Sequence, residues 1–172
     1  ETGTDGATVL DHYYHQTIYS SNFDNRDRAQ TSRQTSYEIR NVDDGQGGTY
    51  QLTGKFTDSI TQVESFTERG QMLRYTRTPI QDSMKTVETT LADNEYNQYG
   101  SLTHSEISIT DSSISKNEQD DTVYGEILTK SQTITTDNTS FDRQGRVLQY
   151  VRKTEELGAG DTLIKTTDEV TT

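Results

Sequence analysis

The sequence contains no cysteine, no tryptophan and a single proline, Pro79. Without cysteine the chain can form no disulfide, no thiolate nucleophile and no cysteine-based zinc site. Large apolar residues are also scarce, because Leu, Ile, Val and Phe together make up only 31 of the 172 residues. A sandwich of two packed sheets needs many inward-facing residues of this kind, so the composition disfavours a compact two-layer core.

Long apolar runs and an excess of basic residues are missing as well. No run of 18 apolar residues occurs, so we expect no membrane insertion. Asp and Glu number 28 against 16 Lys and Arg, which gives a formal net charge of −12. Nucleic-acid phosphates select patches of Lys and Arg, so we expect no nucleic-acid partner. The acidity favours solubility.

The residues that are present point to β-structure. Low apolar content with high net charge is typical of disordered chains, but the sequence has 30 Thr and ten Tyr, and both residue types favour strands. Apolar and polar side chains alternate with a period of two in many places, and no stretch carries a clear helical stripe. The nearest to a helix is residues 84–91, where Thr and Val favour a strand instead. The clearest alternation covers residues 9–19, 50–60, 102–110, 126–135, 146–153 and 162–170.

These strands and the small stock of core residues predict an architecture. Parallel α/β folds are excluded, because their strands are continuous apolar runs. We predict an all-β fold of mostly antiparallel, long β-hairpin repeats that form an open, largely single-layer twisted sheet, with a β-barrel or sandwich as the alternative. In an open sheet the large side chains stay partly accessible to water, and we expect this of Phe66, Leu102, Phe141 and Leu148.

A short pattern recurs between the strands: an aromatic residue, three polar residues, Gly, any residue and an aliphatic residue. Copies begin at Phe66, Tyr96 and Phe141, and a degenerate copy begins at Phe23, with Asp27 in the place of the glycine. The pattern fits a hairpin, since Gly adopts a positive φ at no steric cost and Asp is among the next best residues there. The turns are therefore expected near Asp27, Gly70, Gly100 and Gly145, with a positive φ at the three glycines.

One copy of this pattern carries a family resemblance. The segment Phe141–Leu148 resembles the tyrosine-aspartate turn of the RHS/YD-repeat family, aromatic-Asp-x-x-Gly-Arg-aliphatic, and Phe23-Asp24 is similar in its first half. The copies at Phe66 and Tyr96 lack both the Asp and the Arg. The resemblance implies a large secreted or surface bacterial protein, or a related animal adhesion receptor, whose repeats spiral long hairpins into a shell and serve as scaffold.

The start of the chain bears on where the protein resides. Glu1-Thr2-Gly3 resembles the scar that a secretion vector leaves after signal-peptide cleavage, so we interpret residues 1–3 as vector scar. Residues 4–172 are then a single β-repeat domain of about four hairpin units. A secretory route agrees with an extracellular or cell-surface location. It also makes Asn138, in the sequon Asn138-Thr139-Ser140, a candidate glycosylation site.

Neither a metal site nor an enzyme is predicted. His12 and His15 point to opposite sides of one strand, so they cannot chelate one ion together without a bulge. No G-x-S-x-G, P-loop or HExxH motif occurs, and few apolar residues are available to build a dry pocket. Acidic turns offer oxygens to calcium, but we interpret them as solvated, and we expect no cofactor. These acidic groups are Asp24 with Asp27, Asp43 with Asp44, and Glu118 with Asp120 and Asp121.

The tyrosines leave two interpretations open. Cross-strand aromatic contacts stabilise a sheet that lacks a second layer, which is the interpretation we favour. Alternatively, Tyr50, Tyr75 and Tyr150 form a candidate binding face for glycan or protein. We therefore expect a non-enzymatic structural segment of a larger secreted or surface protein, acting as scaffold, spacer or shell wall beside neighbouring repeats. The alternative is an adhesin-type binding module that uses its Tyr- and Thr-rich sheet faces.

Overall fold

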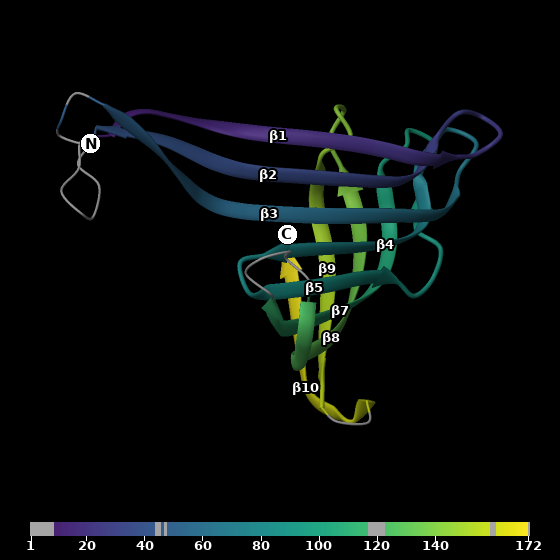
Figure 1. Cartoon of the computed structure of the whole chain (residues 1–172). Helices are drawn as coiled ribbons and strands as arrows, with labels where there is room; N and C mark the ends of the chain where they lie inside the picture. The colour runs from purple at the N-terminus through teal and green to yellow at the C-terminus, as the bar shows by residue number, and fades with distance from the viewer. Residues whose placement is uncertain (1–8, 44–45, 47, 117–122, 159–160, 172) are drawn as a thin grey trace.

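The structure is a computed structural model that describes residues 9–43, 46, 48–116, 123–158 and 161–171 (Figure 1). These residues form strands and turns, and none of them forms an α-helix. The ten strands are β1 Val9–Phe23, β2 Ala29–Asp43, β3 Thr49–Phe66, β4 Met72–Gln81, β5 Met84–Thr90, β6 Glu95–Tyr96, β7 Leu102–Lys116, β8 Val123–Phe141, β9 Val147–Leu157 and β10 Leu163–Thr171.

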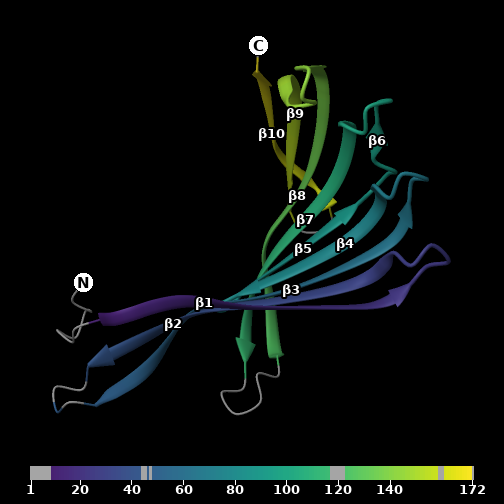
Figure 2. The same ribbon diagram turned by 90° about the horizontal axis from the view of Figure 1, so that it is seen from above.

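All ten strands belong to one antiparallel sheet whose order follows the chain, β1-β2-β3-β4-β5-β7-β8-β9-β10, with β6 paired to β7. The sheet is strongly twisted: in Figure 1, β1, β2 and β3 run across the view, whereas β8, β9 and β10 run up it. Figure 2 shows the strands converging near the middle of the molecule and fanning apart at its ends. The sheet stays open between its edge strands β1 and β10, so the predicted open antiparallel sheet is confirmed and the alternative of a closed barrel is wrong.

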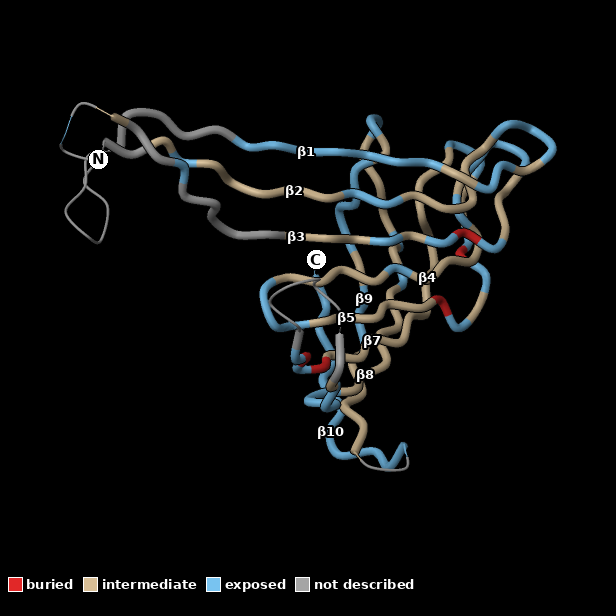
Figure 3. The backbone as a smooth tube through the Cα atoms, in the orientation of Figure 1, coloured by how far each residue is buried: buried red, intermediate tan, exposed pale blue. Residues whose placement is uncertain are grey.

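The apolar side chains do not gather into one core. Among the described residues, only Val63 and Ile114 are buried hydrophobic side chains (Figure 3). The chain exposes 11572 Å² in all, whereas a compact monomer of this size exposes roughly 8,500 Å². Leu148 is exposed, and Phe66, Leu102 and Phe141 are only partly covered, as the sequence predicts for an open sheet.

Two details of the strands bear on the sequence-based expectations. Residues 84–90 form strand β5, which a two-residue turn at Asp82-Ser83 joins to β4, so the strand interpretation of this stretch is confirmed. The alternation predicted over residues 50–60 is interrupted in β3. Tyr37 pairs with Phe56 but Ile39 pairs with Thr53, so β3 places two residues opposite one residue of β2. An extra residue of this kind reverses the alternation from that point on.

Candidate functional site: a ladder of turns

Four turns of one construction lie along one border of the sheet. We number them turn 1 (residues 24–28), turn 2 (67–71), turn 3 (97–101) and turn 4 (142–146). In each, the N–H of the first residue donates to the carbonyl of the fifth, and the N–H of the fourth donates to the carbonyl of the first, at 2.8–3.1 Å. The chain therefore reverses in the same way four times, joining β1 to β2, β3 to β4, β6 to β7 and β8 to β9.

The first residue of each turn also holds the loop with its side chain. The Oδ1 atoms of Asp24, Asn97 and Asp142 each accept the backbone N–H groups of the third and fifth residues of their turn, at 2.9–3.0 Å. In turn 2, Oγ1 of Thr67 accepts the N–H of Gln71 at 3.1 Å. A short polar side chain at this place supplies acceptors for N–H groups that the tight loop would otherwise leave unpaired.

The fourth residue of each turn lies in the left-handed region of φ. The angles are 58° at Asp27, 88° at Gly70, 89° at Gly100 and 79° at Gly145. The positive φ that the sequence predicts at the three glycines is therefore observed, at equivalent positions. Asp27 takes the same conformation with a side chain, which Asp tolerates better than most residues.

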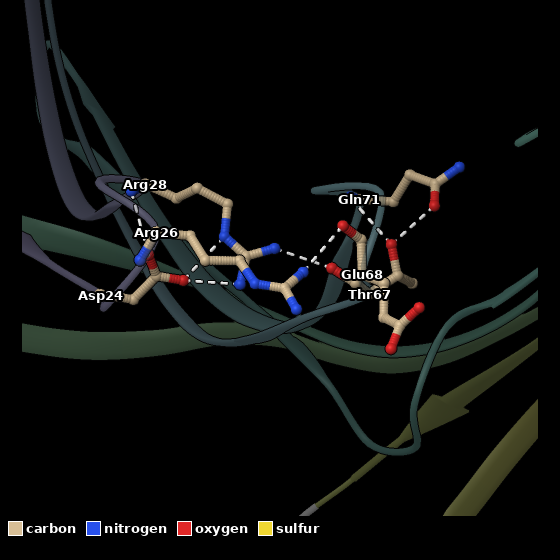
Figure 4. A network of polar contacts seen from close by, with 6 residues as sticks. All are labelled: Asp24, Arg26, Arg28, Thr67, Glu68 and Gln71. Atoms are coloured by element: carbon tan, nitrogen blue, oxygen red, sulfur yellow. Dashed lines mark hydrogen bonds and ion pairs between the residues drawn. The ribbon is translucent and has the colours of Figure 1, made fainter.

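Turns 1 and 2 are bonded to each other by arginine side chains, although 39 or more residues separate the bonded groups along the chain (Figure 4). Nη1 of Arg28 donates to the carbonyl oxygen of Thr67 at 2.7 Å, and Nη1 of Arg26 donates to that of Glu68 at 3.1 Å. The guanidinium of Arg28 also lies over the ring of Phe66, 4.6 Å from its centroid. Each bond joins a charged donor to a backbone acceptor, which makes it stronger than a neutral hydrogen bond.

The same relation continues along the border. Nε2 of Gln71 in turn 2 donates to the carbonyl of Gly100 in turn 3 at 3.1 Å, and Arg69 donates to the carbonyl of Gln98. Oγ of Ser101 in turn 3 donates to the carbonyl of Gly145 in turn 4 at 3.3 Å. The fifth residue of each of the first three turns thus donates to the backbone of the following turn. We call this array the turn ladder.

The fifth residue of turn 4 is Arg146, and it differs from Arg28 in one respect. Both arginines hold the aspartate that begins their own turn, with Nε 2.7 Å from Asp24 Oδ2 and 2.6 Å from Asp142 Oδ2 respectively. The Arg28 side chain is 25% exposed, whereas that of Arg146 is 77% exposed. Within the described ranges, no turn lies beyond turn 4 to cover Arg146.

These contacts set the acidity of the two aspartates. The hydrogen bond from the Arg28 side chain, together with the backbone N–H groups of Arg28 and Arg26, lowers the pKa of Asp24 from 3.8 to about 2. The pKa of Asp142 is also lowered, first by the backbone N–H of Arg146 and then by its guanidinium. Partial desolvation opposes both shifts. Both carboxylates are therefore held ionised as structural acceptors, a role unlike that of a general acid.

A groove of about 770 Å³ lies between turns 3 and 4 and is lined by both turns and the end of β8. Only the short side chain of Ser101 bridges turns 3 and 4 here. The longer side chains of Arg28 and Gln71 bridge turns 1 and 2 and turns 2 and 3, respectively. Tyr99, at the rim of the groove, is 81% exposed. The remaining lining residues are Asn97, Ser101, Thr139, Ser140, Phe141, Asp142, Arg143, Gln144 and Gly145.

Two tyrosines of the candidate binding face, Tyr75 and Tyr150, lie apart in the sheet. Tyr75 lies in β4 and Tyr150 in β9, with β5, β7 and β8 between them. Both hydroxyls are bonded to carboxylates of neighbouring strands, Tyr75 to Glu88 and Tyr150 to Glu169, each at 2.5 Å. Burial, reinforced by Glu88, raises the pKa of Tyr75 above its ordinary range. Tyr50 belongs to β3, and its side chain lies outside the described part of the structure.

Metal ligands do not converge in the described ranges of the chain, where no three His, Cys, Asp or Glu side chains form a group able to hold an ion. Nδ1 of His104 lies 2.6 Å from Asp137 Oδ1, and His15 packs beside the ring of Tyr37. The acidic groups at residues 43–44 and 118–121, and the side chain of His12, fall outside what is described.

In the described part of the chain, no helix has the length and apolar character needed to span a membrane.

Asn138 of the sequon lies within β8, between β7 and β9. Its Nδ2 donates to the carbonyl of Leu102, where turn 3 ends, at 3.0 Å. The nitrogen that would carry a sugar is therefore engaged in a partly buried hydrogen bond that supports the ladder.

The residues that sequence reasoning missed are the ladder donors. The pattern allows any residue at the fifth position of each turn, yet this position holds Arg28, Gln71, Ser101 and Arg146, all of which carry side-chain donors. Comparing this one position across the four copies would have exposed the shared property. A second missed residue is Asn94, which is buried and ties the start of β6 to β4 through bonds to the carbonyls of Met72 and Leu73.

Comparisons with known proteins found no matching family model, no matching curated protein and no matching solved structure.

Proposed function

We propose that the chain is a non-enzymatic structural segment of a larger secreted or surface protein, in which it serves as scaffold, spacer or shell wall. The observation that carries this proposal is the turn ladder. Every hairpin turn in it is bonded to the next by a side-chain donor, so the device fixes one hairpin beside another along the sheet.

The rest of the sheet supports the same role. Its faces are lined mainly by Thr, Ser, Gln and charged side chains, and lateral strand pairing replaces a dense core. The two aspartates whose pKa values are lowered, Asp24 and Asp142, both hold turns. A wall of this kind has its shape set by its backbone hydrogen bonds and its turn contacts.

The test is to loosen the ladder and measure the shape of the sheet. A triple variant, Arg28→Ala, Gln71→Ala and Ser101→Ala, removes the fifth-position donors. The matched control, Asn25→Ala, Gln98→Ala and Arg143→Ala, changes three exposed residues at the second position of their turns. We expect solution scattering to show a larger and more variable radius of gyration for the triple variant only, with strand content retained by circular dichroism. Equal profiles for the two variants would refute the scaffold role of the ladder.

The groove between turns 3 and 4 supports one alternative, an adhesin-type binding module for glycan or protein. Tyr99 is almost fully exposed at its rim, and exposed aromatic rings suit docking onto sugars or flat protein surfaces. A saturable hit on a glycan array that Tyr99→Ala abolishes, while Tyr14→Ala leaves it intact, would establish this function in place of the structural one. Tyr14 is a suitable control because it is 73% exposed and lies in β1, outside the residues that line the groove.

A further inference from the structure

The turn ladder has a direction. The fifth residues of turns 1, 2 and 3 each donate to the backbone of the turn that follows in the chain, never to the one before. Arg146, the last of these residues, therefore has its place on the side of turn 4 that faces β10. At the opposite end Phe23, which begins the first copy of the pattern, is 56% exposed, while its counterpart Phe66 lies under Arg28.

The local geometry of Arg146 matches that of Arg28. Each arginine is held by the first aspartate of its own turn through Nε, and in each turn that aspartate also accepts the arginine's backbone N–H, at 2.9–3.0 Å. This grip orients the guanidinium and leaves other N–H groups for a second acceptor. In turn 1 the second acceptor is the carbonyl of Thr67. The guanidinium of Arg146 is oriented in the same way and faces solvent.

Strand β10 stands where the first strand of a further hairpin would stand. Ser32, four residues after Arg28, pairs with Thr61, and Phe66 follows Thr61 by five residues. Ser105, four residues after Ser101, pairs with Thr136, and Phe141 follows Thr136 by five residues. Tyr150, four residues after Arg146, pairs with Thr171. Threonine thus occupies the same register position in β3, β8 and β10.

The free border of β10 is ready for another strand. Every residue of β10 is exposed, including Ile164 and Val170 at 69% and 64%, and among the described strands β10 pairs with β9 alone. A strand paired on one side leaves a row of backbone N–H and C=O groups on the other, which a further strand can satisfy. Because β10 runs toward the turn border, an antiparallel neighbour must run away from that border. The strand that leaves a turn on this border does this, whereas β1 of a second copy with its turns on the same border would run toward it.

We propose that Arg146 and the free edge of β10 form a docking site for a fifth hairpin turn of the same class, continuous with β10. Its aromatic residue lies under the Arg146 guanidinium, its first carbonyl accepts from Arg146, and its returning strand pairs with β10. This inference rests on the proposed function, since it names the neighbouring repeat that a scaffold segment contacts.

The experiment compares the full chain with the same chain extended after Thr172 by a copy of its own Val63–Gln81. That extension places the copied Phe66 five residues after Thr171, as the register requires. Hydrogen exchange of the β10 amides is measured in both chains. In the extended chain we expect the alternate β10 amides that face outward to exchange at least about 100-fold more slowly, since they become paired within a sheet.

Arg146→Ala is then made in both chains, with Arg143→Ala as the control in the same turn. In the extended chain Arg146→Ala should make these β10 amides exchange at least about tenfold faster, because the backbone acceptor of the added turn loses its charged donor. Arg143→Ala should leave their exchange unchanged, and in the unextended chain neither variant should change β10 exchange. Replacing the copied phenylalanine by alanine should act like Arg146→Ala and serves as a second test if that variant folds poorly.

Three results would overturn the proposal. The first two are unchanged β10 exchange in the extended chain and equal effects of Arg146→Ala and Arg143→Ala. The third is that the unextended chain sediments as a dimer and its β10 amides are protected from hydrogen exchange. The last result would assign the edge to a second copy. Any of the three leaves the scattering test of the ladder unaffected. Conversely, a glycan-array hit that replaces the structural function would leave the exchange result standing.

Discussion

Nη1 of Arg28 donates to the carbonyl oxygen of Thr67 across 2.7 Å, joining two hairpins whose turns are 39 residues apart in the chain. The same guanidinium rests on Phe66 and pairs with Asp24, so one side chain serves its own turn, the next turn and the aromatic between them. Contacts that bridge hairpins in this way are what a sheet without a second layer has in place of a core.

The first prediction concerns this residue. Arg28→Ala should lower the free energy of unfolding by about 1–2 kcal/mol, because a charge-assisted hydrogen bond and a cation–π contact are both lost. Urea denaturation followed by circular dichroism measures the change. Asn25→Ala, an exposed residue in the same turn, is the control and should change stability by less than about 0.5 kcal/mol. Equal losses in the two variants would show that Arg28 does not join the hairpins energetically.

Alanine at the fourth position of a turn should lower the free energy of unfolding, as measured by urea denaturation, and should lower it more at Gly100 than at Gly70. Gly100→Ala should destabilise the protein by about 2 kcal/mol, since alanine is strained at this positive φ. The added Cβ would also lie 2.6 Å from Gln71 Nε2, which must then leave its bond to turn 3. Gly70→Ala carries the same backbone strain, but its Cβ meets nothing closer than 3.9 Å, so it should cost about 1 kcal/mol.

Asp27 should respond in the opposite direction. Asp27→Gly relieves the cost of a side chain in the left-handed region, so the midpoint of thermal unfolding should rise by a few degrees. The greater freedom of glycine in the unfolded chain offsets part of this gain. Differential scanning calorimetry of the two chains decides the matter. A lower midpoint for Asp27→Gly would mean that the aspartate side chain makes a contribution larger than its backbone strain.

Acid should loosen turn 1 in a defined pH range. The pKa of Asp24 falls from 3.8 to about 2 on folding, so the folded state favours its ionised form. The stabilisation is complete above pH 4 and is lost as the pH falls from about 4 toward 2. Carboxyl ¹³C chemical shifts give the midpoint directly. Asp24→Asn should show a shallower loss of stability across this range than the parent chain, whereas Asn25→Ala, at an exposed residue of the same turn, should not. A midpoint near 4 for Asp24 would contradict the geometry of the turn.

Tyrosine truncations should separate the sheet contacts from the exposed rings. Tyr75→Ala should lower stability by about 1–3 kcal/mol, because its half-buried ring and its bond to Glu88 are lost while no sealed core collapses. Tyr99→Ala removes a ring that is 81% exposed and should change stability by less than about 0.5 kcal/mol. Denaturant unfolding of both variants provides the comparison. A similar cost at both positions would mean that ring burial is not what stabilises this sheet.

The sequence predicts the strands and turns of this fold well because both depend on local chemistry. Positive φ at Gly70, Gly100 and Gly145 is a property of single residues, and alternation at β-branched positions is a property of neighbours. The ladder is different, since Arg28, Gln71 and Ser101 differ in charge and length and share only the ability to donate. Their acceptors are backbone carbonyls, which leave no mark in a sequence. Strand register decides which carbonyl each donor reaches.

The break in alternation within β3 had a local signal that the period-two pattern concealed. Apolar side chains recur at the even positions Tyr50, Leu52, Phe56 and Ile60, yet Gly54 and Lys55 together lie opposite Glu38. A glycine inside a strand often marks such a bulge. Tyr75 and Tyr150 lie apart for a non-local reason: strand order places three strands between them, and nothing in the residues themselves encodes that separation.

The scarcity of buried apolar surface also governs how the protein responds to temperature. Exposure of apolar groups dominates the heat-capacity change of unfolding, which for ordinary globular chains is about 12–15 cal/mol/K per residue. A sheet in which only Val63 and Ile114 are buried hydrophobic side chains, among those described, has little such surface left to expose. Its heat-capacity change therefore falls below that range, and its stability curve is broad and shallow. Cooling should weaken this protein far less than it weakens one held together by a core.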